Sequence, residues 1–384
     1  MASIDGGPSV KTGLLPQLRM QTSWFYVFPA EWLDNQVLFN ANGHLWEVGI
    51  TPGSWKSAGP ARQITSGSSE EESPRAVKVG GGTRIVFSAR SVSMHLWGLK
   101  LDMNAGKALG ELEALPHSGG SQGDPSASAD GSKLVYVQAE PDNRSFRVRD
   151  LVSGRETTLL SVSGRPCVSP DGSLVAYMDL NQRTLNLIPI AGGEATRLLQ
   201  FKGPGHVFGW SPDGAKILYW EGNPVRYSTF DAKTRQSALL ISHREYNIHD
   251  ATFSPDQRWL AFHTPFERQT KIWIAPVRDG RAAADSEWIT VIDLGTDSRK
   301  PWWSPDGNLL YFFSNQDGFH CLYAQRLDAS KHPAGRPFPV YHSHQFGEGL
   351  GSNRTRWGMA KLPGRIIVPL FEGTSNVWIA ERKE

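Results

Sequence analysis

Short apolar runs recur along this chain, and each of them follows a polar turn. One run occupies residues 174–178, and similar runs occupy 216–220, 259–262 and 309–313. Continuous apolar runs of four or five residues are typical of strands that are covered on both faces. The pattern therefore predicts stacked β-sheets rather than a sheet with one face open to water.

The turns before these runs share one sequence. Ser-Pro-Asp-Gly occurs at 169–172, 211–214 and 304–307, with near copies at 128–131 and 254–257. Proline fixes φ at the second position, Asp can bond nearby backbone, and glycine supplies a positive φ at the last. We therefore expect Gly172 and Gly214 to tolerate substitution less well than the loop glycine Gly120. The last positions of the five copies are 41, 42, 43 and 50 residues apart, a period that predicts a β-propeller.

Each repeat contains four predicted strands. In the repeat that begins at Gly164 they cover residues 166–168, 174–178, 184–190 and 196–199. Weaker copies of the turn and its strand occur at 33–39, 81–87 and 362–368, which brings the number of repeats to eight. The last repeat lacks a fourth strand, and residues 4–19 resemble the missing piece, so we expect residues 14–18 to pair with 377–381 and close the ring.

These observations predict an all-β fold with a single domain, residues 1–384. It is an eight-bladed β-propeller of four-stranded antiparallel blades, with seven blades as the alternative if a terminal repeat is misread. The third strand of several repeats carries an aromatic residue after an aliphatic one, and we interpret these rings as core between blades rather than as a ligand platform. They are Trp46, Trp97, Trp273, Tyr323 and Trp378. The blades are expected to start near residues 23, 74, 124, 164, 205, 249, 299 and 354.

The Ser-Pro-Asp-Gly turns followed by apolar strands resemble the WD40-like repeat of the TolB-type propellers. The resemblance covers nearly the whole chain, although the turns at 34–35, 81–82 and 363–364 depart from the motif. It implies a propeller that serves as a binding or scaffolding platform more often than as an enzyme. It transfers no catalytic residues to this sequence.

Composition narrows the partners that we expect. The chain has 384 residues with a net charge of +2, which indicates neither a nucleic-acid footprint nor a basic membrane patch. No apolar stretch approaches the ~20 residues of a membrane span, and the first residues lack the core of a signal peptide. We expect a soluble monomer without a cofactor, and it is either cytoplasmic or the extracytoplasmic part of a longer protein. A longer protein is expected because the sequence opens in the middle of a hairpin.

Three motifs carry possible chemistry. Residues 119–123 match the Gly-x-Ser-x-Gly elbow of hydrolases, but no predicted helix follows, so Ser121 is not expected to be a nucleophile. His342 and His344, with Glu348 nearby, are possible metal ligands on a loop, but a single His-x-His is weak evidence and no metal is expected. Cys167 and Cys321 fall in different blades, so no disulfide is expected.

Ionisable residues recur just ahead of the first strand of most repeats. In a propeller these positions converge at one mouth of the central channel, where they either bind an anionic small molecule or an acidic peptide terminus, or simply line a water-filled channel. The residues are Arg75, Asp124, Arg165, His206, His249, Asp250, Arg299, Lys300 and Arg356.

Two functions are compatible with these positions. The first is a non-catalytic interaction or sensor module that binds a protein, a peptide or an anionic small ligand. The second is a hydrolase or lyase that uses His206 or His249 as a base beside Asp124 or Asp250. The absence of an embedded catalytic motif and the spread of charges around a symmetric ring favour binding.

Overall fold

The structure is a computed structural model that describes residues 28–41, 43–66, 69–117, 119–140, 143–266, 269–343 and 358–383. The predicted closing strand at 4–19 therefore lies outside the described residues. The chain divides into two compact units, whereas the repeat pattern led us to expect one domain over 1–384. The first unit comprises Met1–Ser93 with Glu372–Glu384, and the second comprises Met94–Phe371.

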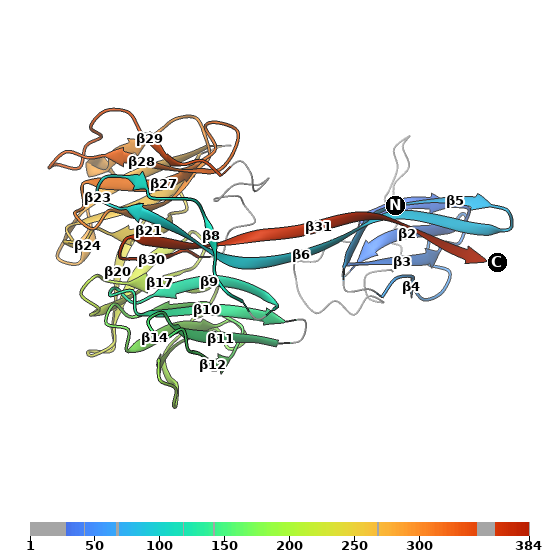
Figure 1. Cartoon of the computed structure of the whole chain (residues 1–384), viewed down its shortest axis with the longest axis horizontal. Helices are drawn as coiled ribbons and strands as arrows, with labels where there is room; N and C mark the ends of the chain where they lie inside the picture. Colours follow the sequence, from blue (N-terminus) through green and yellow to red (C-terminus); the bar gives the residue numbers. More distant parts are fainter. Residues whose placement is uncertain are drawn as a thin grey trace. The chain divides into compact units, whose positions relative to one another are not determined.

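The first unit contains a four-stranded sheet and a long hairpin (Figure 1). Val37, Phe39 and Val48 form a small core on one face of the sheet, because the apolar positions of its strands alternate. The hairpin consists of β5 (Glu70–Val79) and the beginning of β6 (Gly82–Asp102). The sheet follows the chain in order: β1 (Phe28–Leu33), β2 (Gln36–Ala41), β3 (His44–Gly49) and β4 (Arg62–Gln63).

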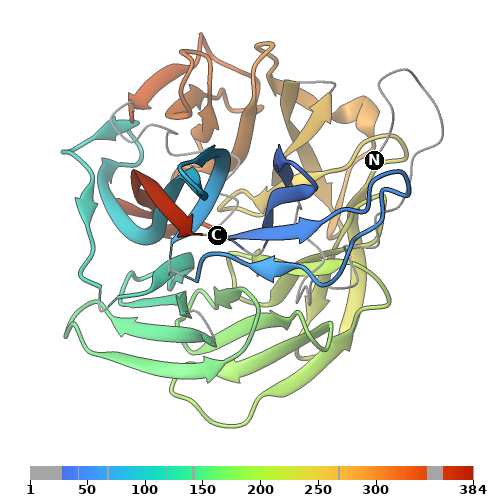
Figure 2. The ribbon, with the colours of Figure 1, turned by 90° about the vertical axis from the view of Figure 1, so that its right-hand side faces the viewer.

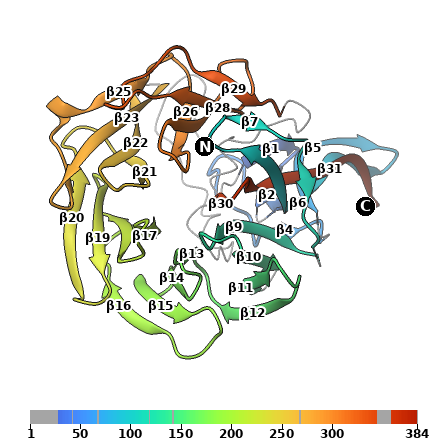
Figure 3. The same ribbon diagram turned by 60° about the vertical axis from the view of Figure 1, so that its left-hand side comes forward.

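The second unit contains five sheets that succeed one another around a ring (Figures 2 and 3). In each, the first strand in sequence is the innermost and its neighbours follow outward. The first two sheets are β9 (Ser121–Ala127), β10 (Lys133–Glu140), β11 (Asn143–Asp150) and β12 (Glu156–Ser161), then β13 (Pro166–Val168), β14 (Leu174–Asp179), β15 (Thr184–Pro189) and β16 (Thr196–Gln200).

The other three sheets repeat this arrangement. The fourth sheet has two short additions, β24 (Arg281–Ala282) and a 3₁₀ turn η2 (Asp285–Glu287). The strands are β17 (Gly205–Trp210), β18 (Lys216–Glu221), β19 (Arg226–Asp231) and β20 (Gln236–Ser242); β21 (His249–Phe253), β22 (Trp259–Phe266), β23 (Gln269–Arg278) and β25 (Ile289–Ile292); and β26 (Ser298–Trp303), β27 (Leu309–Ser314), β28 (Cys321–Arg326) and β29 (Phe338–Tyr341).

A sixth sheet joins strands that are far apart in the sequence. β30 (Ala360–Leu362) pairs with the beginning of β31 (Arg365–Lys383), which lies beside β6, and the end of β6 pairs in turn with β8 (Glu113–Ala114) and β7 (Lys107–Ala108). The backbone N–H of Leu101 donates to the carbonyl oxygen of Gly364 at 2.9 Å. Strands from the two ends of the second unit therefore complete one blade.

Hydrophobic clusters join every sheet of the second unit to the next. Leu134 of β10 packs in one cluster with Ile367 of the sixth sheet, and Tyr311 of β27 packs in another with Ile366. Four further clusters join the intervening pairs of sheets. The described part of the second unit is thus a closed ring of six sheets, whose core lies between the blades.

The predicted all-β fold of four-stranded antiparallel sheets is confirmed, but the predicted count of eight blades is not, nor is the alternative of seven. The runs at 85–87 and 96–97 look like two strands of one blade but belong to the single strand β6, and β31 likewise contains 366–368 and 377–378. The expected blades near 74 and 354 therefore share one sheet. Trp378 is 56% exposed, so its expected place in a core between blades is wrong.

The repeated turn has the expected chemistry. In the copy at 169–172 the Ser169 hydroxyl donates to Asp171 Oδ1 at 2.5 Å, and the backbone N–H of Leu174 donates to Ser169 Oγ at 2.9 Å. The hydrogen bond from Ser169 lowers the pKa of Asp171. Gly172 takes a φ of 71°, and Gln257 takes the same role at 59° in the copy without glycine.

Candidate ligand site at the centre of the ring

The innermost strands of the second unit carry most of the predicted ring. Asp124 lies on β9, His206 on β17, and Arg165 immediately precedes β13. His249 and Asp250 lie on β21, and Arg299 and Lys300 lie on β26. These strands surround the centre of the ring in Figure 3.

Two members of the predicted set are not part of this group. Arg75 belongs to the first unit, where it lies on β5 with its Nε 3.5 Å from Glu31 Oε2. Arg356 lies outside the described residues. The ring that can be described therefore consists of residues from β9, β17, β21 and β26 together with Arg165.

Three of these residues occupy an unusual backbone conformation at equivalent places. Asp124, Asp250 and Lys300 have φ values of 46°, 51° and 53°, and each precedes the turn Asp of its repeat by six positions. The pairing register shifts at each position, so each residue sits in a β-bulge of an innermost strand. Positive φ is uncommon for residues with a side chain, and bulges redirect side chains next to functional sites.

Asp124 and Arg165 form an ion pair between neighbouring blades. Arg165 Nε lies 3.0 Å from Asp124 Oδ1, and the backbone N–H of Gly358 donates to the same oxygen at 3.0 Å. The Asp124 side chain is 4% exposed and that of Arg165 is 33% exposed. Burial raises the pKa of Asp124 above its usual value, and the charge of Arg165 opposes that rise.

Lys300 interacts with carboxylates from two other blades. Burial lowers the pKa of Lys300 to about 8, and the charges of Asp250 and Asp124 oppose this decrease. Arg165 and Arg299 also act on Lys300 and lower its pKa further. These groups come from four different blades, and the innermost strands that carry or adjoin them surround the centre of the ring (Figure 3).

Two histidines of this region, the buried His263 and the partly buried His206, are neutral at neutral pH. His263 Nδ1 lies 3.3 Å from Asp250 Oδ2 without hydrogen-bond geometry, and burial lowers the pKa of His263 to about 4. Burial lowers the pKa of His206 to about 3, helped by the charge of Arg165. A third histidine, His249, stacks on His263 with their ring centroids 5.4 Å apart.

Sequence reasoning missed three polar residues of this region. His263 lies on β22 directly opposite His249, and the apolar run around it hid it. Asp297 pairs with Arg299, and its Oδ2 lies 3.2 Å from His320 Nε2. Asp297 stands just before β26 and two positions before Arg299. Extending the search by two positions ahead of each first strand would therefore have found it.

The hydrolase-like segment at 119–123 is not a nucleophile elbow. Ser121 is the first residue of β9, and no helix follows it. Its hydroxyl oxygen accepts the backbone N–H of Met94 at 3.2 Å. The segment therefore lacks the strand–turn–helix arrangement that a nucleophile elbow requires.

The possible metal ligands of the sequence are only partly described. His344 and Glu348 lie outside the described residues, whereas His342 meets Asp317 and Cys321, with metal-binding atoms of all three within 4.8 Å of one another. His342 Nδ1 lies 2.9 Å from Asp317 Oδ2. Cys321 is fully buried, and burial raises the pKa of its thiol, so the thiol is protonated at neutral pH when no metal is bound. Cys167 and Cys321 are both free thiols, as expected.

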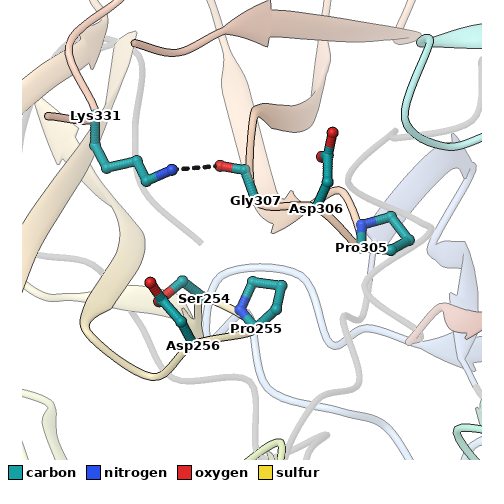
Figure 4. A pocket seen from close by; sticks show the side chains of 7 residues that line it. All are labelled: Ser254, Pro255, Asp256, Pro305, Asp306, Gly307 and Lys331. Carbon is teal, nitrogen blue, oxygen red and sulfur yellow. Dashed lines mark hydrogen bonds between the residues drawn. The ribbon is translucent and has the colours of Figure 1, made fainter. Parts of the chain in front are cut away.

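A small cavity lies between the repeated turns of two neighbouring blades (Figure 4). It has a volume of about 340 Å³ and contains Lys331, whose Nζ donates to the carbonyl oxygen of Gly307 at 2.7 Å. Asp256 and Asp306 line it, but each accepts a hydrogen bond from the serine of its own turn at 2.5 Å. These groups serve the turns, and the cavity is not a stronger candidate than the ring. It is lined by Ser254, Pro255, Asp256, Pro305, Asp306, Gly307 and Lys331.

Comparisons with known proteins agree with this architecture. No family model matches the chain. An uncharacterized protein of Agrobacterium fabrum is 31% identical over 154 residues, which are 38% of this chain and 49% of that protein. The match therefore spans about half the length of that relative.

Among the helices of the described ranges, none combines the length and the apolar character needed to cross a bilayer.

Solved structures match more of the chain. A protein from Agrobacterium tumefaciens assigned as TolB has a TM-score of 0.54 and 19% identity over 73% of this chain and 99% of its own. The nidogen/laminin complex contains a chain with a TM-score of 0.50 and 13% identity over 66% of this chain and 95% of its own. Oligogalacturonate lyase in complex with manganese has a TM-score of 0.43 and 17% identity over 77% of this chain and 87% of its own. The repeated turns, the ring of four-stranded sheets and the first of these matches together show that the chain has the fold of the TolB-type β-propellers.

Proposed function

We propose that this chain is a non-catalytic binding module whose central ring receives an acidic peptide segment of a partner protein. The observation that supports the proposal is the set of bulges that redirect Asp124, Asp250 and Lys300 at equivalent places on three innermost strands. A non-glycine residue at positive φ costs stability and persists where the surrounding structure enforces it. Three such residues with charged side chains in one region favour a site over a passive channel lining.

The charges of the ring indicate the chemistry of the ligand. Arg165, Arg299 and Lys300 stand beside Asp124, Asp297 and Asp250, so the ring is not a uniformly positive funnel. A ligand that carries both carboxylates and N–H donors can contact both kinds of group, and an acidic peptide has this combination. A third of the Arg165 side chain reaches solvent, which leaves it accessible to a ligand carboxylate.

The alternative is a hydrolase or lyase that uses His206 or His249 as its base, and the pKa values argue against His206 in that role. An efficient general base has a pKa near the working pH, whereas that of His206 is lowered to about 3. His263 beside Asp250 has a pKa of about 4, so it is equally unsuited to that role. The uncharged imidazole of His206 is better suited to donate or accept one hydrogen bond than to remove a proton from a substrate.

A ligand screen by thermal unfolding tests the proposal. Acidic peptides should raise the melting temperature in a saturable way, and ligand at 100 times its Kd should add about 2.7 kcal/mol of stability. Arg165→Ala should weaken peptide binding at least about 10-fold. Arg165→Lys should weaken it nearly as much if the guanidinium holds a carboxylate through two parallel hydrogen bonds.

Arg278 provides a matched control, because it is an exposed arginine paired with Glu287 on the surface of the fourth sheet. Arg278→Ala should leave peptide binding unchanged. Small carboxylates such as acetate and succinate should stabilise the chain less than the peptides do. If neither peptides nor small anions shift the melting curve at millimolar concentration, the ring only lines a solvent channel and the proposal is wrong.

A further inference from the structure

We propose that Asp317, Cys321 and His342 form a binding site for a zinc-like divalent metal ion. This site shares no residue with the central ring and does not depend on the function proposed for it. Its three residues come from one blade. Asp317 lies between β27 and β28, Cys321 is the first residue of β28, and His342 directly follows β29.

The geometry suits coordination to one ion. The ligand atoms lie within 4.8 Å of one another, and the donors around tetrahedral zinc are roughly 3.3–3.7 Å apart, given the usual zinc–ligand distances. His342 Nδ1 and Asp317 Oδ2 are now 2.9 Å apart. A small outward movement of these two surface side chains would therefore admit an ion between them and the sulfur.

The ligand set also selects the kind of metal. One sulfur, one imidazole nitrogen and one carboxylate oxygen favour zinc, cobalt or a similar borderline ion, whereas calcium and magnesium prefer oxygen alone. Three protein ligands leave the fourth tetrahedral position for water. Metal binding requires the thiolate form of Cys321, so each bound ion releases the thiol proton.

The surroundings fix two of the three ligands. The backbone N–H of Ser343 donates to Cys321 Sγ at 3.4 Å, and the Ser343 hydroxyl donates to the carbonyl oxygen of His320 at 3.2 Å. These contacts hold the end of β29 against the start of β28. His342 and Cys321 are therefore already close before an ion binds, which reduces the loss of conformational entropy on binding.

Metal titration of the untagged chain, after treatment with a chelator, tests the site. Zinc should bind with one equivalent per chain and raise the melting temperature. Cobalt should produce a thiolate-to-metal charge-transfer absorption. Cys321→Ala should abolish this absorption, and His342→Ala and Asp317→Asn should each weaken zinc binding by more than the roughly 10–100-fold that loss of an outer partner costs.

Two control variants separate this site from adventitious binding. Cys167→Ala removes the other cysteine, which lies on β13, and His332→Ala removes an exposed histidine near Asp328. Both should leave the cobalt absorption intact. If Cys321→Ala fails to fold, the surface variants His342→Ala and Asp317→Asn still decide the question. No stoichiometric zinc binding, or a cobalt absorption that survives His342→Ala and Asp317→Asn, overturns the proposal.

Discussion

Arg165 Nε lies 3.0 Å from Asp124 Oδ1, so one ion pair connects the innermost strand of one blade to the residue that begins the next. The two partners differ in their surroundings, because Asp124 is almost completely buried while Arg165 is partly solvated. Removing one partner of a buried pair leaves the other without its compensating charge. The consequences of removing either side should therefore be unequal.

We expect Arg165→Ala to lower the free energy of unfolding more than Asp124→Ala does, by about 1–3 kcal/mol at pH 7. The reason is that Arg165→Ala leaves a buried carboxylate with less compensation.

The raised pKa of Asp124 makes the stability lost in Arg165→Ala depend on pH. A carboxyl with a raised folded-state pKa contributes stability below its unfolded pKa of 3.8, and this contribution is lost as the pH rises through the folded value. The cost of Arg165→Ala should thus be smaller at pH 5 than at pH 7 in urea unfolding. An equal cost at both pH values would contradict this assignment.

The buried histidine His263 should make the chain sensitive to acid. Its pKa is about 4 in the folded protein against 6.5 for an unperturbed imidazole. Its contribution is therefore complete above pH 6.5 and is lost as the pH falls toward 4, because the unfolded chain then binds the proton more readily. A shift of this size corresponds to about 3 kcal/mol. We expect His263→Gln to lose less stability than the unmodified chain between pH 6.5 and 4, as measured by urea unfolding.

His332 is the control for this prediction, because its side chain is 61% exposed. His332→Gln should follow the unmodified chain at every pH. If His263→Gln follows it as well, the imidazole of His263 is not held neutral by the fold.

The fold could be predicted from the sequence because the turn chemistry is local. Ser169, Asp171 and Gly172 make their contacts within six residues of one another, so the period was visible without any tertiary information. The division into blades was less visible, because a strand as long as β6 looks like two strands when an apolar run recurs along it. The pairing of β6 with β31 is nonlocal, and no short sequence pattern encodes it.

The candidate site shows the same limit. Asp124, Asp250 and Lys300 could be found because each stands six positions ahead of a repeated turn. His263 could not, because its relation to Asp250 depends on the pairing of β21 with β22 and on the bulge between them. The assignment of Arg75 to a different unit likewise depends on where the chain leaves the ring, which the repeat pattern does not record.

Two glycines should both be intolerant of a side chain, although the sequence suggested this for only one of them. Gly172 has a φ of 71°, and a Cβ there would lie 3.1 Å from Ser128 Cβ. Gly120 has a φ of 66°, and a Cβ there would lie 2.9 Å from the carbonyl oxygen of Ala139. The expectation that Gly120 is the more tolerant position therefore loses its basis. We expect Gly120→Ala and Gly172→Ala each to cost about 1–2 kcal/mol of stability, which the midpoint of denaturant unfolding would show.

Gly203 supplies the comparison for these variants, because a Cβ at this position would have no neighbour within 4 Å and its φ is not in the left-handed region. Gly203→Ala should leave the midpoint of denaturant unfolding almost unchanged or slightly raised. A cost at Gly120 no larger than that at Gly203 would mean that the loop before β9 relaxes around the added methyl group.

The closure of the ring can be tested with two consecutive residues of β31. Ile366 and Ile367 are both fully buried, but alternation along the strand places Ile366 in the cluster with Tyr311 and Ile367 in the cluster with Leu134. Each side chain thus joins the sixth sheet of the second unit to a different neighbouring sheet. We expect Ile366→Ala and Ile367→Ala each to lower the free energy of unfolding by about 2–5 kcal/mol. Val152→Ala, at a position 85% exposed, should change it by less than about 0.5 kcal/mol.

If the ring is closed by this sheet, both isoleucine variants should still unfold in a single transition of the second unit, because each interface supports the other. A large loss of stability for one isoleucine variant and none for the other would mean that the sixth sheet packs against a single neighbour and the ring is open.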